Sequence, residues 1–465
     1  MLDQIDREMQ DNFAPIHAEY DEPALRIVGE LPRGLAGTLY RNGPNPQFAP
    51  VDPLRHHWFV GDGMVHAFTL GEGRASYRNR WVRTDKWRAE HAAGRALVPG
   101  FGGPAVNGAE IPNTGVANTN IVWHGGRLLA LEEAHLPFEL DPATLETRGV
   151  QTFDGALQGR FTAHPKIDPE TGELVFFGYS VDGPFSPGMS WGAVGRDGRV
   201  TRVEHFQAPY SSMVHDFAVT ADHVVFPVLP LSGSMARARA GQNPYAWEPE
   251  LGGYVGVMRR DAGVASLRWF RAENCYVFHV LNAWDEGGRI LVDVIQYDEA
   301  PLFPRADGRP ADPAAQRGRL VRWTIDPAAG TDTFGRAQLD EMSGEFPRLD
   351  ERRAGLPNRF GTFVGESRSE GLADTVVWLD LTAGRRAAYT VSAGDALSEP
   401  VFVPRSSDAA EGDGWLLAVA WRGAESRSDL LVLDTSGIEK GPVATVRLPH
   451  RVPFGFHGNW VGAGA

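Results

Sequence analysis

Short apolar runs alternate with tight turns along the whole chain. Seven of these runs set a glycine or aspartate turn against β-branched or aromatic residues, at 125–133, 172–180, 221–230, 287–298, 373–381, 414–423 and 429–437. This pattern is typical of β-strands joined by turns, and no long amphipathic helix pattern accompanies it. The 54 glycines and 33 prolines are spread over the length of the chain, as expected when many short strands need many turns. The sequence therefore predicts an all-β fold.

The strand-turn units repeat, although the repeats are degenerate. Second strand phrases follow several of the runs, for example at 136–149 and 431–449, and about five to seven units can be distinguished. A radial array of small four-stranded sheets accommodates many strands and leaves few exposed edges. We therefore predict a β-propeller, with an array of β-sandwiches as the alternative. No linker rich in serine, glycine or charge divides the chain, which predicts a single domain over residues 1–465.

Charge and cysteine content limit the partners and the compartment. The formal net charge is -14 and the pI is near 5.5, so a phosphate backbone would be repelled and no nucleic acid is expected as a partner. The single cysteine, Cys275, cannot form an internal disulfide, and the charged first ten residues lack the apolar core of a signal peptide. A cytoplasmic protein is expected.

No apolar run approaches the roughly 18 residues of a membrane span. One apolar segment, residues 95–106, is broken by glycine and proline. It is interpreted either as an ordinary loop over a pocket or as a weak peripheral contact with a lipid surface.

Four histidines share an unusual setting. His164 in FTAHPK, His215 in SMVHDFAVT, His279 in YVFHVLNAW and His457 in FGFHGNW each lie among apolar and aromatic residues beside a predicted strand. One such histidine is usually a core residue with its ring nitrogens paired. The first three are separated by 51 and 64 residues, about one propeller blade each, and the fourth lies near the C-terminus, where a ring of blades would close.

Histidines at the same position of successive blades would meet at the propeller axis. Four neutral imidazoles there would hold a divalent metal, and iron, copper, nickel and zinc are all chemically admissible. Zinc is disfavoured, because catalytic zinc usually keeps three protein ligands and structural zinc usually recruits cysteine.

Three glutamates are candidate partners of these histidines. A metal-bound histidine normally donates its second ring N–H to an acceptor. Glu133, Glu345 and Glu399 lie in apolar settings, where a carboxylate is costly unless it is paired. Each could also be an ordinary surface glutamate.

Ten ordered motifs resemble the carotenoid cleavage oxygenase family, in the bacterial branch that includes lignostilbene and isoeugenol oxygenases. They are LYRNGPNPQF, WFVGDGMVHAF, NRWVRT, ANTNIVWH, FTAHPKIDPETGE, MVHDFAVT, FHVLNAWDEG, GEFPRLDERRAG, SEPVFVPR and EGDGWLLAVAW. The match runs from about Leu39 to Trp460 and so covers nearly the whole chain. The resemblance implies a seven-bladed β-propeller with an axial metal site, and with loops and short helices that cap a substrate cleft.

The resemblance also implies a metal and a reaction. His164, His215, His279 and His457 match the ligands of one non-haem Fe(II) per chain, and Glu133, Glu345 and Glu399 match the glutamates behind them. Thr119, in ANTN, matches a threonine beside an open coordination position. The implied reaction cleaves a conjugated alkene with O2 into two carbonyl products and needs no added reductant.

Substrate contacts are implied by the same resemblance. Phe59 matches an aromatic residue that stacks on the substrate ring, while Phe101 and Glu132 stand where stilbene-cleaving relatives have a tyrosine and a lysine that contact a phenolic hydroxyl. A glutamate cannot donate a hydrogen bond as an ammonium does, so a phenol is either not recognised or recognised differently. Stilbenoids, propenyl or vinyl phenols and apocarotenoids are all candidate substrates.

Two other functions are compatible with the fold. One is a propeller that binds a hydrophobic ligand without cleaving it, and the other is an isomerohydrolase that uses the same iron as a Lewis acid. The complete set of four histidines argues against a pure binding protein.

Overall fold

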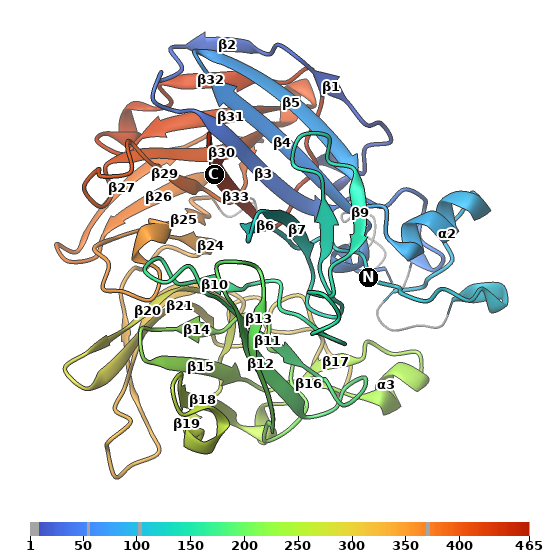
Figure 1. The fold of residues 1–465 in the computed structure, drawn as a ribbon, viewed down its shortest axis with the longest axis vertical. Helices are drawn as coiled ribbons and strands as arrows, with labels where there is room; N and C mark the ends of the chain where they lie inside the picture. Colours follow the sequence, from blue (N-terminus) through green and yellow to red (C-terminus); the bar gives the residue numbers. More distant parts are fainter. Residues whose placement is uncertain (1–8, 54–55, 101–104, 369–372, 465) are drawn as a thin grey trace. The chain divides into compact units, whose positions relative to one another are not determined.

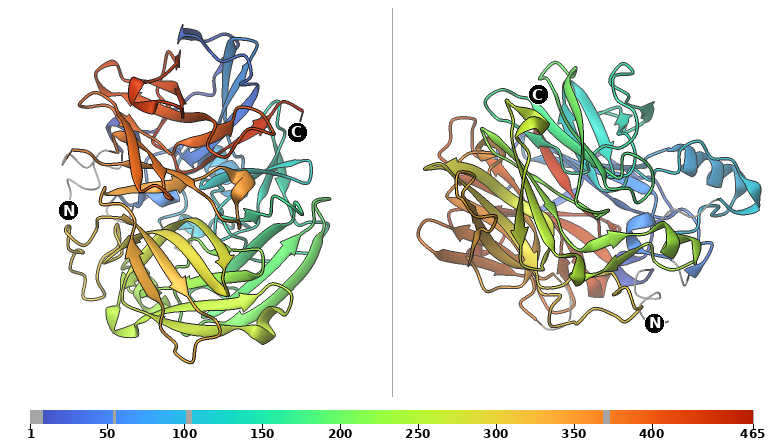
Figure 2. Two further views of the ribbon diagram at one scale, coloured as in Figure 1. Left: turned by 90° about the vertical axis from the view of Figure 1, so that its left-hand side faces the viewer. Right: turned by 90° about the horizontal axis from the view of Figure 1, so that it is seen from below.

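Strands and turns make up most of the computed structural model, which describes residues 9–53, 56–100, 105–368 and 373–464. Both views in Figure 2 show short strands joined by turns along the chain. The α-helices of the described part are α2 (Asp85–Ala93) and α3 (Met235–Arg239). Short 3-10 helices are η1 (Asp11–Phe13), η3 (Trp58–Val60), η4 (Val106–Gly108), η5 (Pro249–Leu251), η6 (Gly263–Ser266), η7 (Glu351–Arg353), η8 (Gly423–Glu425) and η9 (Ile438–Lys440). Over the described residues, every helix is too short or too polar to span a bilayer.

The chain forms two compact units. The first comprises Met1–Gln158, Glu366–Trp378 and Arg386–Ala465, and the second comprises Gly159–Gly365 and Leu379–Arg385. The prediction of one domain over 1–465 is not tested by this division and stays a prediction.

Three sheets lie in the first unit. One has the order β1 (Asp21–Glu22), β5 (Arg74–Trp81), β4 (Gly63–Gly71), β3 (Gly37–Pro44), β33 (Gly458–Gly462). The next is β6 (Asn120–His124), β7 (Arg127–Leu131), β8 (Phe138–Leu140), β9 (Thr147–Val150). The third is β2 (Arg26–Gly29), β32 (Ala444–Arg447), β31 (Arg427–Asp434), β30 (Gly414–Arg422), β28 (Ala396–Leu397), and β29 (Val401–Pro404) also pairs with β30.

Three four-stranded sheets lie in the second unit. They are β10 (Lys166–Ile167), β11 (Leu174–Tyr179), β12 (Gly188–Val194), β13 (Val200–Gln207); β14 (Ala218–Val219), β15 (His223–Val228), β18 (Gly253–Arg259), β19 (Arg268–Ala272); and β20 (Tyr276–Glu286), β21 (Arg289–Tyr297), β22 (Arg319–Ile325), β23 (Gly335–Gln338). A two-stranded ribbon pairs β16 (Leu231–Gly233) with β17 (Tyr245–Trp247).

One more sheet has the order β24 (Gly344–Arg348), β25 (Phe360–Gly365), β26 (Thr375–Asp380), β27 (Arg385–Thr390). The described residues therefore form seven sheets of four or more strands. This confirms the predicted seven-bladed β-propeller.

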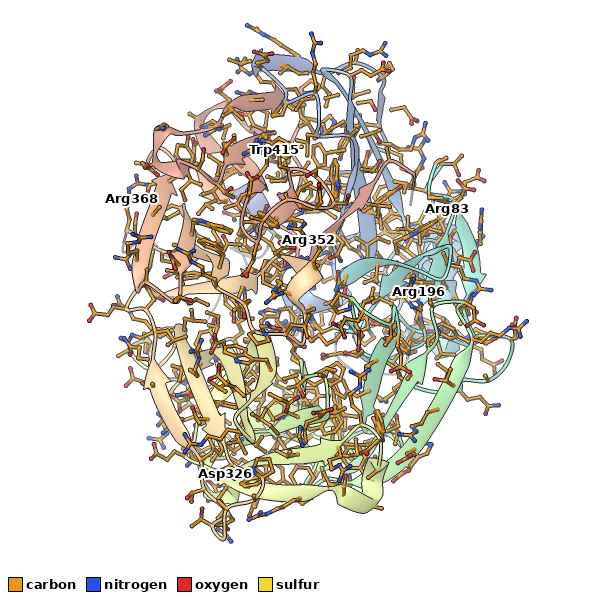
Figure 3. The ribbon with its side chains drawn as sticks, turned by 60° about the vertical axis from the view of Figure 1, so that its left-hand side comes forward. Arg83, Arg196, Asp326, Arg352, Arg368 and Trp415 are labelled. Atoms are coloured by element: carbon orange, nitrogen blue, oxygen red, sulfur yellow. The ribbon has the colours of Figure 1, made fainter. Side chains whose placement is uncertain are left out.

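Burial follows the amino-acid pattern within each sheet. Strand β30, GWLLAVAWR, is a continuous apolar run, and its first seven residues are buried, as expected for a strand covered on both faces. Strand β13, VTRVEHFQ, alternates between exposed and partly buried residues over most of its length, as expected for a strand with one solvated face. Trp415 of β30, labelled in Figure 3, is buried, and the guanidinium of Arg405 lies over its ring at 4.8 Å from the centroid.

The two ends of the chain meet in two sheets of the first unit. Strand β33 pairs antiparallel with β3, from Gly37 opposite Gly462 to Arg41 opposite Gly458. Strand β2 pairs with β32 in the same manner, as Figure 1 shows. A single buried cluster packs these two sheets together. It includes Leu39, Phe68, Leu417, Leu430 and Val446. Hydrogen bonds and apolar burial thus hold β2, β3 and β33 in place.

Replacing Gly43 by alanine tests this closure. A Cβ added at Gly43 would lie 2.5 Å from the Cα of Gly455, and two backbones cannot separate without disturbing the pairing around them. Forced packing of this kind costs about 1–3 kcal/mol, so we expect a lower melting temperature in thermal denaturation. Gly71→Ala is the matched control, because its nearest neighbour would be 4.0 Å away. Equal melting temperatures for the two variants would contradict the close approach.

Candidate metal centre

Three of the predicted ligands lie together in the second unit. Nε2 of His164 is 3.0 Å from Nε2 of His215. The ring of His279 is centred 5.1 Å from the ring of His164 and 5.0 Å from that of His215. All three side chains are buried. Two nitrogens bound to one metal at right angles, with bonds of about 2.1 Å, are about 3.0 Å apart, so this spacing fits a shared cation.

The repeated sheets explain why these histidines meet. His164 comes two residues before β10, and His215 three residues before β14, so each precedes the first strand of its sheet. His279 lies in β20, the first strand of the next sheet, where the pairing with β21 is irregular between Val277 and Val280. The beginning of three successive sheets therefore supplies one ligand each, as the spacing in the sequence predicts.

His279 is oriented by Glu345 on β24. Nδ1 of His279 donates to Oε2 of Glu345 at 2.5 Å, the hydroxyl of Tyr297 donates to Oε1 at 3.0 Å, and the backbone N–H of Phe346 donates to Oε2 at 2.6 Å. Phe346 has a φ of 56° and stacks on the His279 ring, with centroids 5.3 Å apart. A protonated Nδ1 leaves Nε2 with the lone pair that a metal needs.

His457 is held in the same way within the first unit. Its Nδ1 donates to Oε1 of Glu399 at 2.8 Å, and the backbone N–H of Gly458 donates to Oε2 at 2.8 Å. Both side chains are buried, and the side chain of Glu399 is 1% exposed. Glu399 is therefore not the surface residue that was the alternative in the sequence.

The four predicted ligands form one group. One nitrogen each from His164, His215, His279 and His457 lies within 4.8 Å of the other three, and all four side chains are buried. The donor set holds no carboxylate and no thiolate, so it would leave a bound dication with its full charge. Four imidazoles suit iron, copper, nickel or zinc better than magnesium or calcium, which prefer oxygen ligands.

Two further predicted residues, Thr119 and Glu133, lie in the first unit. Thr119 is partly buried, its hydroxyl donates to Asn118 at 3.0 Å, and its carbonyl accepts from the backbone N–H of His457 at 3.2 Å. Glu133 is partly buried and lies two residues after β7. A position for Thr119 beside an open coordination site, and for Glu133 behind a ligand, stay predictions.

Aromatic side chains surround the residue before His457. Phe59 on η3 meets Phe456 edge-on, with centroids 5.5 Å apart, and Trp58 lies 4.5 Å from the same ring. Trp58 and Phe456 were not singled out in the sequence, although they belong to the WFVGDG and FGFHGN motifs that contain Phe59 and His457. An aromatic wall thus lies next to one predicted ligand.

Glu132 has a partner that the sequence did not reveal. Its Oε1 lies 2.5 Å from Nδ1 of His135, and its side chain is 12% exposed. This close partner occupies one oxygen of the carboxylate. Phe101, the other predicted contact for a phenol, lies outside the described residues.

The segment 95–106 begins over a pocket. Ala96, Val98 and Gly100 line a pocket together with Val60 and with Lys86 of α2. This supports the interpretation of the segment as a loop over a pocket. Residues 101–104 lie outside the described residues, and contact with a lipid surface stays a prediction.

A buried ion group fixes the start of this loop. The ammonium of Lys86 lies 2.7 Å from Asp62 and 2.8 Å from Glu90, whose other oxygen accepts from the backbone N–H groups of Leu97 and Val98. Burial lowers the pKa of Lys86, but the attraction of the two carboxylates outweighs it and raises that pKa above its ordinary value. Lys86 is therefore a charged structural group.

Cys275 is not a nucleophile. Its thiol is fully buried, and burial raises its pKa to about 12. The thiol therefore stays protonated at ordinary pH, and a neutral thiol is a weak nucleophile.

Seven sheets and a group of four buried histidines that could hold a metal ion define a β-propeller with a candidate metal centre. The family model described as retinal pigment epithelial membrane protein, RPE65, matches residues 13–462. The chain belongs to this family, that of the carotenoid oxygenases, as its motifs predict. It is accordingly an oxygenase.

Three similar proteins are named as oxygenases, and each match covers nearly the full length of both chains. Isoeugenol monooxygenase of Pseudomonas nitroreducens is 39% identical, with 99% of each chain covered. Lignostilbene-alpha,beta-dioxygenase isozyme III of Sphingomonas paucimobilis is 35% identical, with 97% of this chain and 96% of the relative covered. The crystal structure of lignostilbene dioxygenase from Pseudomonas brassicacearum is 36% identical, superposes with a TM-score of 0.94 and covers 98% of each chain.

Glu399→Gln should weaken metal binding by about 10- to 100-fold, the usual cost of losing such a partner. His457 and Gly458 donate to different oxygens of Glu399, so the NH2 group of a glutamine would face one of these two donors. Titration with a divalent metal, followed by the rise in melting temperature, measures the affinity. Glu425→Gln is the control, because Glu425 is 53% exposed. Wild-type affinity in the Glu399 variant would show that this carboxylate does not orient a ligand.

Proposed function

We propose that this chain is a non-haem Fe(II)-dependent dioxygenase that needs no organic coenzyme and cleaves a conjugated C=C bond with O2 into two carbonyl products. The observation that carries the proposal is the group of four buried histidines without an acidic ligand. We assign one Fe(II) to each chain, with His164, His215, His279 and His457 as its ligands.

The atoms and electrons of the proposed reaction balance without a cosubstrate. One alkene and one O2 contain all the atoms of two carbonyl products, so no reductant or other cosubstrate is required. Bound Fe(II) would supply the activation of O2, and the conjugated alkene would supply the electrons. The chain then needs no general acid or base.

The protein side chains have three tasks in this proposal. Glu345 and Glu399 accept from Nδ1 of their histidines and keep Nε2 deprotonated, and we assign the same role to Glu133. Thr119 limits access to the open coordination position. Trp58, Phe59 and Phe456 offer an apolar wall, on which burial of a conjugated chain contributes roughly 25 cal/mol per Å².

The proposed substrate is an aryl-alkene of the stilbenoid or phenylpropenoid class. The names of the isoeugenol and lignostilbene relatives support this class, and an apocarotenoid is the second candidate. The proposed location is the cytoplasm, with no nucleic-acid partner and with segment 95–106 as a weak contact for lipid. A non-cleaving binding protein and an isomerohydrolase are the alternatives, and neither would consume O2.

Purified protein loaded with Fe(II) without air should cleave at least one member of a panel of stilbenes, vinyl or propenyl phenols and apocarotenals when O2 is added. Mass spectrometry of the products and an oxygen electrode give the readout. His215→Ala should remove most of the iron and the activity, whereas His205→Ala, at an exposed position of β13, should leave both. Turnover without O2 uptake would favour the isomerohydrolase, and iron at wild-type occupancy in the His215 variant would contradict its assignment as a ligand.

Little discrimination is expected between a 4-hydroxy substrate and its 4-methoxy analogue. One oxygen of Glu132 is already close to His135, and a carboxylate offers no donor to a phenolate. An unpaired buried phenolate would cost several kcal/mol, so most of the binding free energy should come from stacking and apolar burial. The ratio of kcat/KM values for the two compounds measures this. Loss of all turnover on methylation would show that a group in the site does recognise the hydroxyl.

A further inference from the structure

A salt bridge joins the three histidine-bearing segments of the second unit. The ammonium of Lys166 lies 2.8 Å from Oδ1 of Asp216, and Oδ2 of Asp216 accepts from the backbone N–H of Val280 at 2.8 Å. Lys166 stands two residues after His164, Asp216 directly follows His215, and Val280 directly follows His279. One carboxylate is therefore bonded to the segments of the other two ligands.

The carboxylate of Asp216 is buried and surrounded by three donors. Its side chain is 2% exposed, and its oxygens accept from Lys166, from the backbone N–H of Val280 and from that of Phe217 at 2.7 Å. A buried carboxylate that loses a donor suffers the desolvation penalty of an unpaired charge. Any movement of one segment relative to the other two would break one of these bonds.

The backbone at His279 needs such a support. The register of β20 against β21 shifts between Val277 and Val280, and again between Val280 and Asn282. Strand pairing alone holds the chain less firmly at such an irregularity. The bond from Val280 to Asp216 ties this point of β20 to the segment of His215.

We propose that Lys166 and Asp216 are positioning residues of the metal centre, whose ion pair sets the spacing of His164, His215 and His279. The inference rests on the proposed metal site. Metal–ligand distances tolerate errors of about 0.2 Å, so loosening the three segments should lower metal affinity even when every ligand is present.

The first unit contains a matched control. The carboxylate of Asp374 is 2% exposed, pairs with Arg368 at 3.1 Å and accepts from the backbone N–H of Ser367 at 2.8 Å. Arg368, labelled in Figure 3, is 34% exposed, compared with 25% for Lys166. The two ion pairs are thus alike in burial, and Asp374 also accepts from the hydroxyls of Ser367 and Thr375 at 2.8 Å each. No predicted ligand is a sequence neighbour of the control pair.

The test compares Lys166→Met and Asp216→Asn with Arg368→Met and Asp374→Asn in the full-length protein. Titration with Co(II) gives the dissociation constant, the visible absorption of bound Co(II) reports the ligand geometry, and denaturation of the metal-free protein gives the stability. All four variants should lose stability. Only the Lys166 and Asp216 variants should bind Co(II) about 10-fold more weakly with an altered spectrum, and Lys166→Arg should restore both.

Wild-type affinity and spectrum in the Lys166→Met variant would overturn the inference, and this variant carries the test if Asp216→Asn does not fold. An equal loss of affinity in the Arg368 and Asp374 variants would overturn it as well, because the effect would then be one of general stability. A wild-type protein that binds no Co(II) would overturn the metal centre itself, and the inference with it.

Discussion

Neutral imidazoles do not attract one another, and this constraint governs the architecture. Nitrogens with lone pairs that point at a common centre repel each other, so the scaffold must supply what the ligands lack. His279 and His457 are each held through Nδ1 by a carboxylate that a further backbone N–H fixes. The repeated sheets bring the ligand segments together, and the carboxylates of Glu345 and Glu399 fix the orientation of the imidazole rings of His279 and His457.

The scaffold can do this because each sheet is stable through its own hydrogen bonds and apolar burial. Continuous apolar strands such as β30 are covered on both faces, and alternating strands such as β13 face water on one side. Strand pairing and apolar burial thus supply more of the stability than the polar groups near the ligands do. Those polar groups can therefore position the ligands, although their burial carries the desolvation cost of buried charges.

Much of this arrangement can be predicted from the sequence, because strands and turns have local signatures. The strand-turn units predicted the propeller, although degenerate repeats gave only five to seven blades before the family resemblance fixed the number. The apolar settings of His164, His215, His279 and His457 predicted a shared centre, since a buried imidazole is rare unless it is paired. Blade-length spacing made the prediction specific.

Other features could not be predicted from the sequence, because they depend on contacts between segments that are distant in the chain. Lys166 and Asp216 are ordinary charged residues beside ligands, and only the folded chain shows that one bonds the other. Glu132 and His135 are only three residues apart, yet a turn, not a helix, brings them together, so no periodic pattern revealed the pair. Trp58 was not predicted as a site residue, because an aromatic residue in an apolar motif is usually part of the core.

The pairing of β3 with β33 has a consequence for how the protein is made. Strand β3 (Gly37–Pro44) is synthesised long before its partner β33 (Gly458–Gly462). Contacts of such long sequence separation form slowly, and β3 must wait with one edge unpaired. His457 directly precedes that last strand, so the fourth ligand arrives only with the closing segment. A chain that lacks His457 cannot supply all four ligands, so binding of a metal by the full set would follow the synthesis of β33 and its pairing with β3.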